Sequence, residues 1–596
     1  MNYFNHPFTP SIAHKRRATT RLYIPVDQTS MAHLTRGLGL YTRVGLVVRK
    51  EKPPSLYKKG PLTYIPPTSE RDQGKMMAVA SDSGGSDLSS VLLPIKSEGE
   101  EKIGIDEMLQ RFCGEFGPWQ LRHFVLTSLA WALEAFHTMV MIFADREPAW
   151  RCTAPGGLPG CGGATVCDLV PGTWEWIGGP GVSTVAEWGL VCGEKYKVGL
   201  AQSAFFAGCM VGAGVFGHLS DSFLGRKGSL TIVCVMNLIF GCLTAIAPTY
   251  WIYTLLRFLT GFSTGAVGLC SFVLATEPVG PTKRGLAGMS TFYFFSGGIA
   301  ILSAMAYIFQ SWRHLYIISS IPSLLYLVTV IPFIPDSPRW YLVRGNIDKA
   351  MNVMQDIAKC NGKRLPDGVS LTLDDASSQK CDDPTTETAI LGSSLIDVAR
   401  LPLTRVRLIL IVIINFLTSV VYYGLSLNVV NLGTNIYINV ALNAVAEMPA
   451  FALTAWLLDI FGRKPLAIGT MWFSGVFCIV GSLIKNVGVW KHVRMICSIL
   501  GIFGMAGTYN LLFIYAAELF PTVVRNAALG CATQGAQMGA ILAPLVVVLG
   551  GGLPLAMFGV CGLAGGLLAF YLPETLNRPL YDTMAGMEGG ESAREA

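Results

Sequence analysis

Charged side chains are scarce in this sequence of 596 residues: they make up 14% of it, and the mean hydropathy is +0.47. Soluble domains carry about 25% charged residues, which cover much of their surface. The low content therefore excludes an ordinary soluble protein. Lysine and arginine exceed aspartate and glutamate by only 45 to 39. This mild positive charge gives no reason to expect a nucleic-acid partner.

The sequence also lacks several functional motifs. It has no glycine-rich nucleotide-binding loop ending in Lys-Ser or Lys-Thr, so ATP is not an expected partner. Cys360 and Cys381 have no neighbours at metal-ligand spacing, and no metal site is expected. No cofactor is expected apart from a coupling proton, and no Asn-X-Ser/Thr acceptor for N-glycosylation occurs. These absences predict that the chain is not an enzyme.

Long apolar runs dominate what is present. A membrane-spanning helix needs about 20 mostly apolar residues, and twelve runs of this kind occur. They lie near residues 124–143, 198–219, 229–248, 250–274, 287–308, 313–334, 408–427, 430–457, 465–484, 493–516, 527–549 and 553–572. Twelve such runs would leave a soluble enzyme almost no polar surface. We therefore predict an all-α membrane protein with twelve transmembrane helices.

The basic residues of the connecting loops predict the orientation, because lysine and arginine are enriched on the cytoplasmic side of membranes. Alternate loops carry them, whereas the loops between runs 3 and 4, 7 and 8, and 11 and 12 have none. We expect both termini and the long loop 339–406 to be cytoplasmic. The loop 144–197 then faces the outside or a lumen.

The loop 144–197 contains four cysteines, Cys152, Cys161, Cys167 and Cys192. An even number of clustered cysteines in a Gly- and Pro-rich external loop indicates two disulfides. The sequence does not define their pairing, and free thiols are the alternative.

Three marks recur in the second half of the chain in the same order. Asp221 is followed by Glu277 after 56 residues and by the stretch PDSPRW after 114. Asp459 is followed by Glu518 after 59 residues and by the stretch PETLNRP after 114. This spacing indicates two homologous six-helix repeats, a transporter architecture in which one half rocks against the other around a midplane site.

The repeat and the composition together divide the chain into five parts. The predicted parts are a cytoplasmic, mostly disordered extension (1–105), a first six-helix half (106–338), a linker loop (339–406), a second six-helix half (407–573) and a cytoplasmic tail (574–596). Residues 1–76 are basic and acid-poor. They are interpreted as an upstream extension or a disordered arm, with an organelle transit segment as the alternative.

Each half contains one polar stretch between two apolar runs, GHLSDSFLGRK at 217–227 and LLDIFGRK at 457–464. Glycine permits a tight turn there, and the neighbouring acids and bases can pair and separate as the halves move. We predict a latch made of Asp221, Gly225, Arg226, Lys227, Glu277 and Arg284 in the first half and of Asp459, Gly462, Arg463, Lys464, Glu518 and Arg525 in the second. The alternative is that the basic residues only set the membrane orientation.

The stretch GHLSDSFLGRK resembles the signature between helices 2 and 3 of the major facilitator superfamily. The stretches PDSPRWYLVRG, ELFPTVVRN and PETL resemble the organic cation/anion/carnitine transporter branch, and residues 114–152 are similar to its plant members. The resemblance covers roughly residues 103–580. It implies a transporter fold and a small organic solute, although sugar porters share the SPRW and PET marks.

Two acids inside the apolar runs are the first candidates for a solute site, because an ionisable group is costly within a membrane. Glu134 lies in the first run with His137 three residues on, and this spacing places both on one face of a helix. A carboxylate there could bind a cationic solute or carry a coupling proton. Glu447 matches a helix 8 glutamate of cation-handling relatives. The alternative for each acid is a structural role.

The resemblance implies four further residues of a central cavity. Tyr422 and Asn510 match cavity-lining positions, and Phe272 falls where cation-transporting relatives often carry an aromatic residue; simple packing is the alternative for both aromatic residues. Gln537 falls where cation-type relatives tend to have aspartate and anion- or carnitine-type relatives arginine. Because Gln537 is a neutral amide, this position does not indicate the charge of the solute. The preference for a cation or zwitterion therefore rests on Glu134 and Glu447.

The sequence therefore predicts a monomeric secondary or facilitative transporter of small organic cations or zwitterions, carnitine-like or polyamine-like. The coupling is either proton exchange or simple facilitated flux. The membrane is the plasma membrane or the vacuolar membrane. Two alternatives stay open: transport of organic anions or neutral solutes such as sugars, and a membrane sensor that binds its solute without moving it.

Overall fold

The computed structural model describes residues 101–153, 166–170, 172–366, 368–372 and 400–578, and the single positions 398 and 587. In this part of the chain, eleven helices are long and apolar enough to cross a membrane. A twelfth, α20 (Leu553–Ala569), has 17 residues, which is the short end of the spanning range. The twelve predicted runs thus correspond to twelve membrane segments, and the prediction of an all-α membrane protein is confirmed.

The N-terminal half contains six membrane segments, two of which are made of consecutive helices. They are α2 with α3 (Pro118–Met139, Met141–Ala144), α5 (Tyr196–Asp221), α6 (Gly225–Thr244), α7 (Tyr250–Thr276), α8 with α9 (Pro281–Ser290, Phe292–Ile308) and α10 (Trp312–Thr329). The first segment begins six residues before the predicted run. Pro118 starts α2, where its missing N–H is not needed, and the Gln120 side chain accepts a hydrogen bond from Gly117 N (2.9 Å).

The C-terminal half repeats this order. Its segments are α15 (Pro402–Leu427), α16 (Ile436–Phe461), α17 (Arg463–Leu483), α18 (Trp490–Glu518), α19 (Thr522–Val547) and α20. Asn435 caps α16, because its side-chain oxygen accepts the N–H groups of Tyr437 and Ile438. The two halves meet where α5 packs against α19 and α9 packs against α16.

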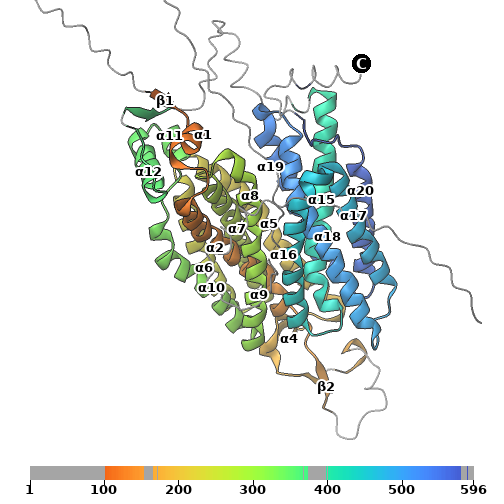
Figure 1. Cartoon of the computed structure of the whole chain (residues 1–596). Helices are drawn as coiled ribbons and strands as arrows, with labels where there is room; N and C mark the ends of the chain where they lie inside the picture. Colours follow the sequence, from red (N-terminus) through yellow and green to blue (C-terminus); the bar gives the residue numbers. More distant parts are fainter. Residues whose placement is uncertain are drawn as a thin grey trace, which may run out of the picture. The chain divides into compact units, whose positions relative to one another are not determined.

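We name the two ends of the helix bundle by the segments that they carry (Figure 1). The linker end carries residues 335–366 and 368–372, including α11 (Pro338–Val343) and α12 (Ile347–Cys360). The loop end carries residues 145–153, 166–170 and 172–195, including β2 (Trp150–Cys152) and α4 (Thr184–Trp188).

A small subdomain at the linker end joins two segments that are far apart in the sequence. Strand β1 (Glu101–Ile103) pairs in parallel with β4 (Val369–Leu371). Behind this pair, α1 (Ile105–Met108) and η1 (Leu109–Cys113) pack against α12 in one apolar cluster. The prediction that residues 101–105 belong to a disordered extension is therefore corrected: they hold the linker segment against the bundle.

At the loop end, β2 pairs with β3 (Trp174–Trp176) in an antiparallel hairpin. A disulfide joins Cys167 to Cys192, which lie in η2 (Val166–Asp168) and η4 (Cys192–Glu194). Cys152 is also disulfide-bonded, and Cys161 lies outside the described residues. Two further short helices, η3 (Pro180–Val182) and α4, complete this region.

Close helix packing within the N-terminal half depends on glycine. Gly208 and Gly212 on α5 face the α7 backbone, and Gly261 and Gly265 on α7 face the α5 backbone. A methyl group at Gly212 would lie 2.6 Å from the carbonyl carbon of Phe262. Pairs of small residues four apart are the usual means by which membrane helices approach this closely.

We expect Gly212→Ala to lower the free energy of unfolding by about 1–3 kcal/mol, because the added methyl forces α5 and α7 apart. The measurement is the thermal unfolding of the purified protein in detergent. Gly214→Ala is the matched control, because nothing lies within 4 Å of a methyl group at that position. Equal destabilisation by the two variants would contradict this account of the packing.

Candidate functional site

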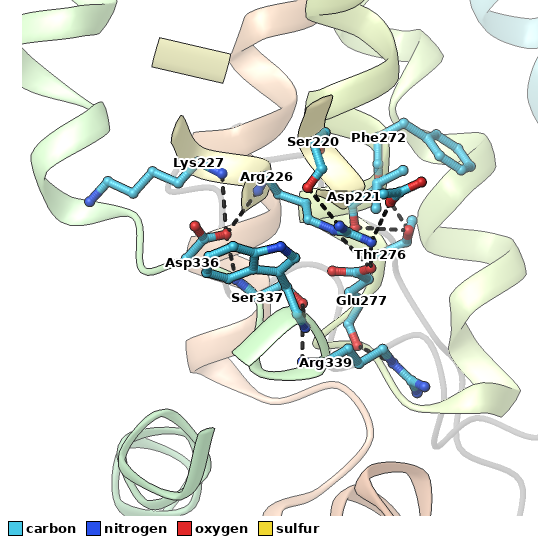
Figure 2. Close-up of polar contacts among 12 residues, drawn as sticks. Ser220, Asp221, Arg226, Lys227, Phe272, Thr276, Glu277, Asp336, Ser337 and Arg339 are labelled. Carbon is cyan, nitrogen blue, oxygen red and sulfur yellow. Dashed lines mark hydrogen bonds and ion pairs between the residues drawn. The ribbon is translucent and has the colours of Figure 1, made fainter. Parts of the chain in front are cut away.

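An ionic network connects three segments of the N-terminal half at the linker end (Figure 2). Arg226, in the first turn of α6, donates from Nε and Nη2 to Glu277 Oε1 at 3.2 and 3.1 Å. Its Nη2 also lies 2.9 Å from Asp221 Oδ1 at the end of α5. The side chains of Arg226 and Glu277 are only 13% and 14% exposed, so water and salt screen this pair less than a surface pair.

Asp336 caps α6 from the stretch PDSPRW. Its Oδ1 accepts hydrogen bonds from the backbone N–H groups of Arg226 (3.1 Å), Lys227 (3.2 Å) and Ser337 (2.9 Å). The first N–H groups of a helix have no partner within the helix and form the positive end of its dipole. The carboxylate therefore fixes the start of α6 to the segment that enters α11.

The C-terminal half contains the equivalent network. Arg463 at the start of α17 donates from Nε and Nη2 to the two carboxylate oxygens of Glu518, both at 2.9 Å. Two parallel bonds of this kind are the strongest geometry available to an arginine and a carboxylate. Thr575 Oγ1 donates to Glu518 as well (2.6 Å).

Glu574, in the stretch PETL, occupies the place of Asp336. It accepts the N–H groups of Arg463 and Lys464, both at 3.0 Å. Burial disfavours the charged carboxylate, yet hydrogen bonds from the backbone N–H groups around it hold the pKa of Glu574 below its usual value. The carboxylate is therefore charged when it caps α17.

Both turns require glycine. Gly225 and Gly462 have φ angles of +75° and +88°, in the region that side chains disfavour. A Cβ atom at Gly225 would lie 2.5 Å from Asp336 Oδ2, and one at Gly462 would lie 2.7 Å from Glu574 Oε2. The glycines thus admit the capping carboxylates.

Three predicted latch residues have other surroundings. Asp459 is exposed and makes no ion pair within the described part of the chain; only two residues lie between it and Gly462, against three between Asp221 and Gly225. Arg284 donates to Asp106 on α1 (2.7 Å). Arg525 has no hydrogen-bond partner for Nε and Nη2 among the described residues.

The two lysines of the predicted latch contact the capping carboxylates through their backbone. Lys227 and Lys464 donate their main-chain N–H groups to the capping carboxylates, and Lys464 Nζ lies 5.3 Å from the centre of the Phe570 ring. Sequence reasoning did not single out Asp336 and Glu574 themselves, although the equal spacing of their motifs from the two aspartates was the signal that pointed to them.

In the interior of the bundle, Glu447 on α16 bridges the halves. It is 1% exposed and accepts hydrogen bonds from Ser296 Oγ on α9 (2.5 Å) and from the Tyr422 hydroxyl on α15 (3.2 Å). Glu447 also lines a cavity of about 10 Å³, which is room for about one water molecule. The carboxyl group thus lies at the contact between the halves.

Glu134 on α2 has a different environment. Its Oε2 is buried and has no hydrogen-bond partner among the described residues. The carboxyl group lies against Gly268 on α7, where a methyl group would come within 2.9 Å of Glu134 Cδ. An unpartnered buried carboxyl oxygen is costly and requires an explanation. A bound cation or a proton would supply one.

Three tyrosines of the C-terminal half surround the same region. The ring of Tyr422 lies 5.2 Å from those of Tyr423 and Tyr509. Tyr423 contacts Phe206 across the halves (4.8 Å). Glu134 lies near all three tyrosines. Aromatic faces beside a carboxylate are a favourable setting for an organic cation.

Two further predicted residues are buried amides. Asn510 is 1% exposed, and neither Oδ1 nor Nδ2 has a partner among the described residues. Gln537 Oε1 is also unpartnered there. Gln537 is one turn from Ile541, whose carbonyl accepts a hydrogen bond from Ser203 on α5 (2.7 Å), so this amide lies on the face of α19 toward the N-terminal half.

Phe272 and His137 have contacts of other kinds. Phe272 packs on Phe513 of the opposite half, with ring centres 5.4 Å apart. The His137 ring lies against Gly241 on α6, and its two nitrogens have no partner among the described residues. Glu134 and His137, three residues apart on α2, thus contact two different neighbouring helices, α7 and α6.

Contacts between the halves at the loop end were not anticipated from the sequence. Tyr437 on α16 stacks on Phe143 of α3 (5.6 Å), and its hydroxyl accepts a hydrogen bond from Arg146 Nη1 (2.6 Å). The Tyr437 carbonyl accepts another from Ser303 on α9 (2.6 Å). These contacts join different elements of the two halves, so no internal repeat could indicate them.

Comparisons with known proteins agree with this architecture. A family model described as "Sugar (and other) transporter" matches residues 181–585. The chain is 67% identical to organic cation/carnitine transporter 4 of Arabidopsis thaliana, over 86% of this chain and 97% of that protein. It is 32% identical to an organic cation transporter protein of Drosophila melanogaster, over 82% and 95% of the two chains.

Among solved structures, the inward-open xylose transporter XylE from E. coli is similar in fold. The TM-score is 0.55 at 15% identity, and the match covers 79% of this chain and 99% of XylE. The partially occluded inward-open form of XylE matches with a TM-score of 0.54 at 16% identity, over 77% and 98% of the two chains. At this identity the similarity concerns the fold alone.

We expect Asp336→Ala and Glu574→Ala each to lower the free energy of unfolding by about 0.5–2 kcal/mol, because each removes a helix cap. Thermal unfolding of the purified protein measures this. Because the pKa of Glu574 is below its usual value, its contribution is present at neutral pH and is lost only as the pH falls through that lowered pKa. The Glu574→Ala difference should therefore persist at about pH 5, above the ordinary glutamate pKa of about 4.3.

The control is Asp459→Ala, which removes an exposed carboxylate from the same end of the bundle. Destabilisation by Asp459→Ala equal to that by Glu574→Ala would show that general charge, and not capping, is the cause.

Proposed function

Because the chain belongs to the sugar (and other) transporter family, in its organic cation/carnitine transporter branch, we propose that it moves small organic cations or zwitterions by alternating access. The observation that carries the substrate class is the Glu134 carboxyl group. Its Oε2 is buried and has no hydrogen-bond partner among the described residues, and the group lies near three tyrosines of the opposite half. A cationic solute between the halves would neutralise Glu134 and contact the aromatic faces.

The charge of the interior supports a cation over a bare anion. Glu134 and Glu447 lie in the region where the halves meet, and α19 carries the neutral Gln537 at the position where relatives have a charged residue. Two carboxylates would repel an anion placed beside them, because charge–charge repulsion is only weakly screened in the interior of the membrane. A zwitterion remains compatible, provided that its cationic group is the end that approaches Glu134.

The latch supports alternating access. In each half, a buried arginine–glutamate pair and a capping carboxylate fix the ends of adjacent helices. Each half is thereby held together at the linker end, whereas the halves are joined to one another through fewer polar contacts, such as Ser296 with Glu447. Such a division allows the halves to move as units around the interior. In the proposed orientation, the linker end is cytoplasmic.

The coupling proposed is proton exchange at Glu134. The carboxyl group binds either a proton, which makes it neutral, or the cationic solute, for which it must be charged. Proton and solute therefore alternate at one site. Glu447 has a separate role, because its hydrogen bonds to Ser296 and Tyr422 tie its environment to the contact between the halves.

Uptake into proteoliposomes tests the proposal. Labelled carnitine, tetraethylammonium, a polyamine, an organic anion and a hexose are compared with and without a pH gradient. We expect cation or zwitterion uptake that responds to the gradient. Glu134→Gln should lower that uptake by about tenfold, which is the effect of losing about 1.4 kcal/mol, and should remove the response to the gradient.

Glu107→Gln is the matched control, because it removes a carboxylate of an exposed i,i+4 pair with Arg111. Uptake of the anion or the hexose that is unchanged by Glu134→Gln would overturn both the substrate class and the role of Glu134. Binding without uptake of any solute would instead identify a sensor.

Glu277→Gln and Glu518→Gln should each slow solute uptake several-fold and leave equilibrium solute binding unchanged, because they loosen a half and leave the interior intact. Both glutamates are largely buried, with side chains 14% and 20% exposed, whereas Glu107 is 44% exposed. Initial uptake rates and binding isotherms on the same preparations give the comparison. A loss of binding equal to the loss of rate would argue against a role in the conformational change.

A further inference from the structure

A second, larger cavity lies at the loop end of the bundle. Its volume is about 520 Å³, within the size range of small-molecule sites. The start of the loop at Asp145–Ala149 and α5 supply one wall, and the ends of α15, α16 and α19 supply the other. It is therefore formed between the halves. Its lining does not include Glu134 or Glu447.

Arg146 is the distinctive residue of this cavity. Its Nη1 donates to the Tyr437 hydroxyl (2.6 Å), and its guanidinium carbon lies 5.5 Å from the centre of the Tyr437 ring. Its Nε is buried and has no hydrogen-bond partner in the described part of the chain. Arg146 lines the cavity and no described carboxylate forms an ion pair with it, so a positive charge lies at the cavity wall.

The two acidic residues next to Arg146 in the sequence also line the cavity. Asp145 lines the cavity, is 6% exposed and is held by hydrogen bonds from Tyr253 (2.7 Å), Thr184 (2.8 Å) and Gln202 (3.2 Å). Glu147 lines it as well and has only a long ion pair, with Lys195 at 3.5 Å. Acidic groups therefore flank Arg146 on both sides in the sequence.

From this arrangement we propose that the cavity is an outer binding site for zwitterions that carry a carboxylate and an ammonium group. The carboxylate binds the Arg146 guanidinium, and the ammonium group lies toward Asp145 and Glu147. Arginine suits this role, because it stays charged and its planar guanidinium carries several donors for a carboxylate. Tyr437 holds the guanidinium in place from the opposite half.

The outer site, which rests on the proposed function for its solute class, divides recognition between two places. The interior around Glu134 offers carboxylates and aromatic faces to the cationic end of a solute. It does not distinguish a carnitine-like solute from a simple quaternary amine. Arg146 binds the carboxylate, which only the zwitterion has. The site therefore favours zwitterions before they reach the interior.

The test is equilibrium binding of labelled carnitine and labelled choline to the full chain in lipid nanodiscs. Both probes carry a quaternary ammonium group, and only carnitine has a carboxylate. We expect Arg146→Gln to weaken carnitine binding at least tenfold and choline binding less than twofold. Arg146→Lys, which keeps the charge without the fork, should also weaken carnitine binding. Tyr437→Phe keeps the guanidinium and should have a smaller effect.

Arg151→Gln is the matched control, because Arg151 lies in the same loop and is paired with Glu175 on the surface. Thermal unfolding of each variant identifies a folding defect, and Arg146→Lys serves if Arg146→Gln fails to fold. Arg146→Gln should weaken carnitine binding by the same factor when Glu134→Gln is also present. Unchanged carnitine binding in both Arg146 variants, or equal loss of carnitine and choline, would overturn the proposal.

Uptake by the same variants in proteoliposomes separates the two proposals. If choline or tetraethylammonium is transported but carnitine binding does not depend on Arg146, the outer site is wrong and the proposed function stands. If carnitine binding depends on Arg146 but no solute is moved, the outer site stands and the proposed function is wrong.

Discussion

The cost of placing a polar group between membrane helices shapes this structure. Without water, each such group needs a partner inside the protein. Most buried groups have one: Glu447 is bonded to Ser296 and Tyr422, and Asp145 accepts three hydrogen bonds. Among the buried atoms without a partner are Glu134 Oε2 and both polar atoms of Asn510. Glu134 lies near the tyrosines of the opposite half, where a solute would supply the missing partner.

The same cost explains why carboxylates cap the helix ends at the linker end. Helix ends expose unpaired N–H groups, and in both halves a carboxylate from a distant segment accepts them. Asp336 closes α6 and Glu574 closes α17, while Arg226 and Arg463 bind glutamates at the ends of α7 and α18. Each half is thus fixed as one unit at this end, as the proposed alternating access requires.

The sequence predicts the parts of this account that depend on composition and spacing. Apolar runs indicate the twelve segments, and the recurrence around Asp221 and Asp459 indicates the paired networks. The partners could not be predicted, because Asp106 reaches Arg284 and β1 reaches β4 only after folding. Three-residue strands carry no periodicity. The Arg146–Tyr437 contact has no counterpart in the repeat, and the spacing of Glu134 and His137 does not indicate which neighbouring helix each contacts.

The central claim is that the buried carboxyl group of Glu134 binds the solute. Mass-spectrometric mapping of carbodiimide labelling on the full chain in lipid tests it most directly, because the reagent modifies protonated carboxyl groups in apolar surroundings. The account predicts labelling at Glu134 that a transported cation suppresses in a concentration-dependent way, with exposed Glu107 unaffected by the solute. Labelling of Glu134 that is unchanged at saturating solute would contradict it.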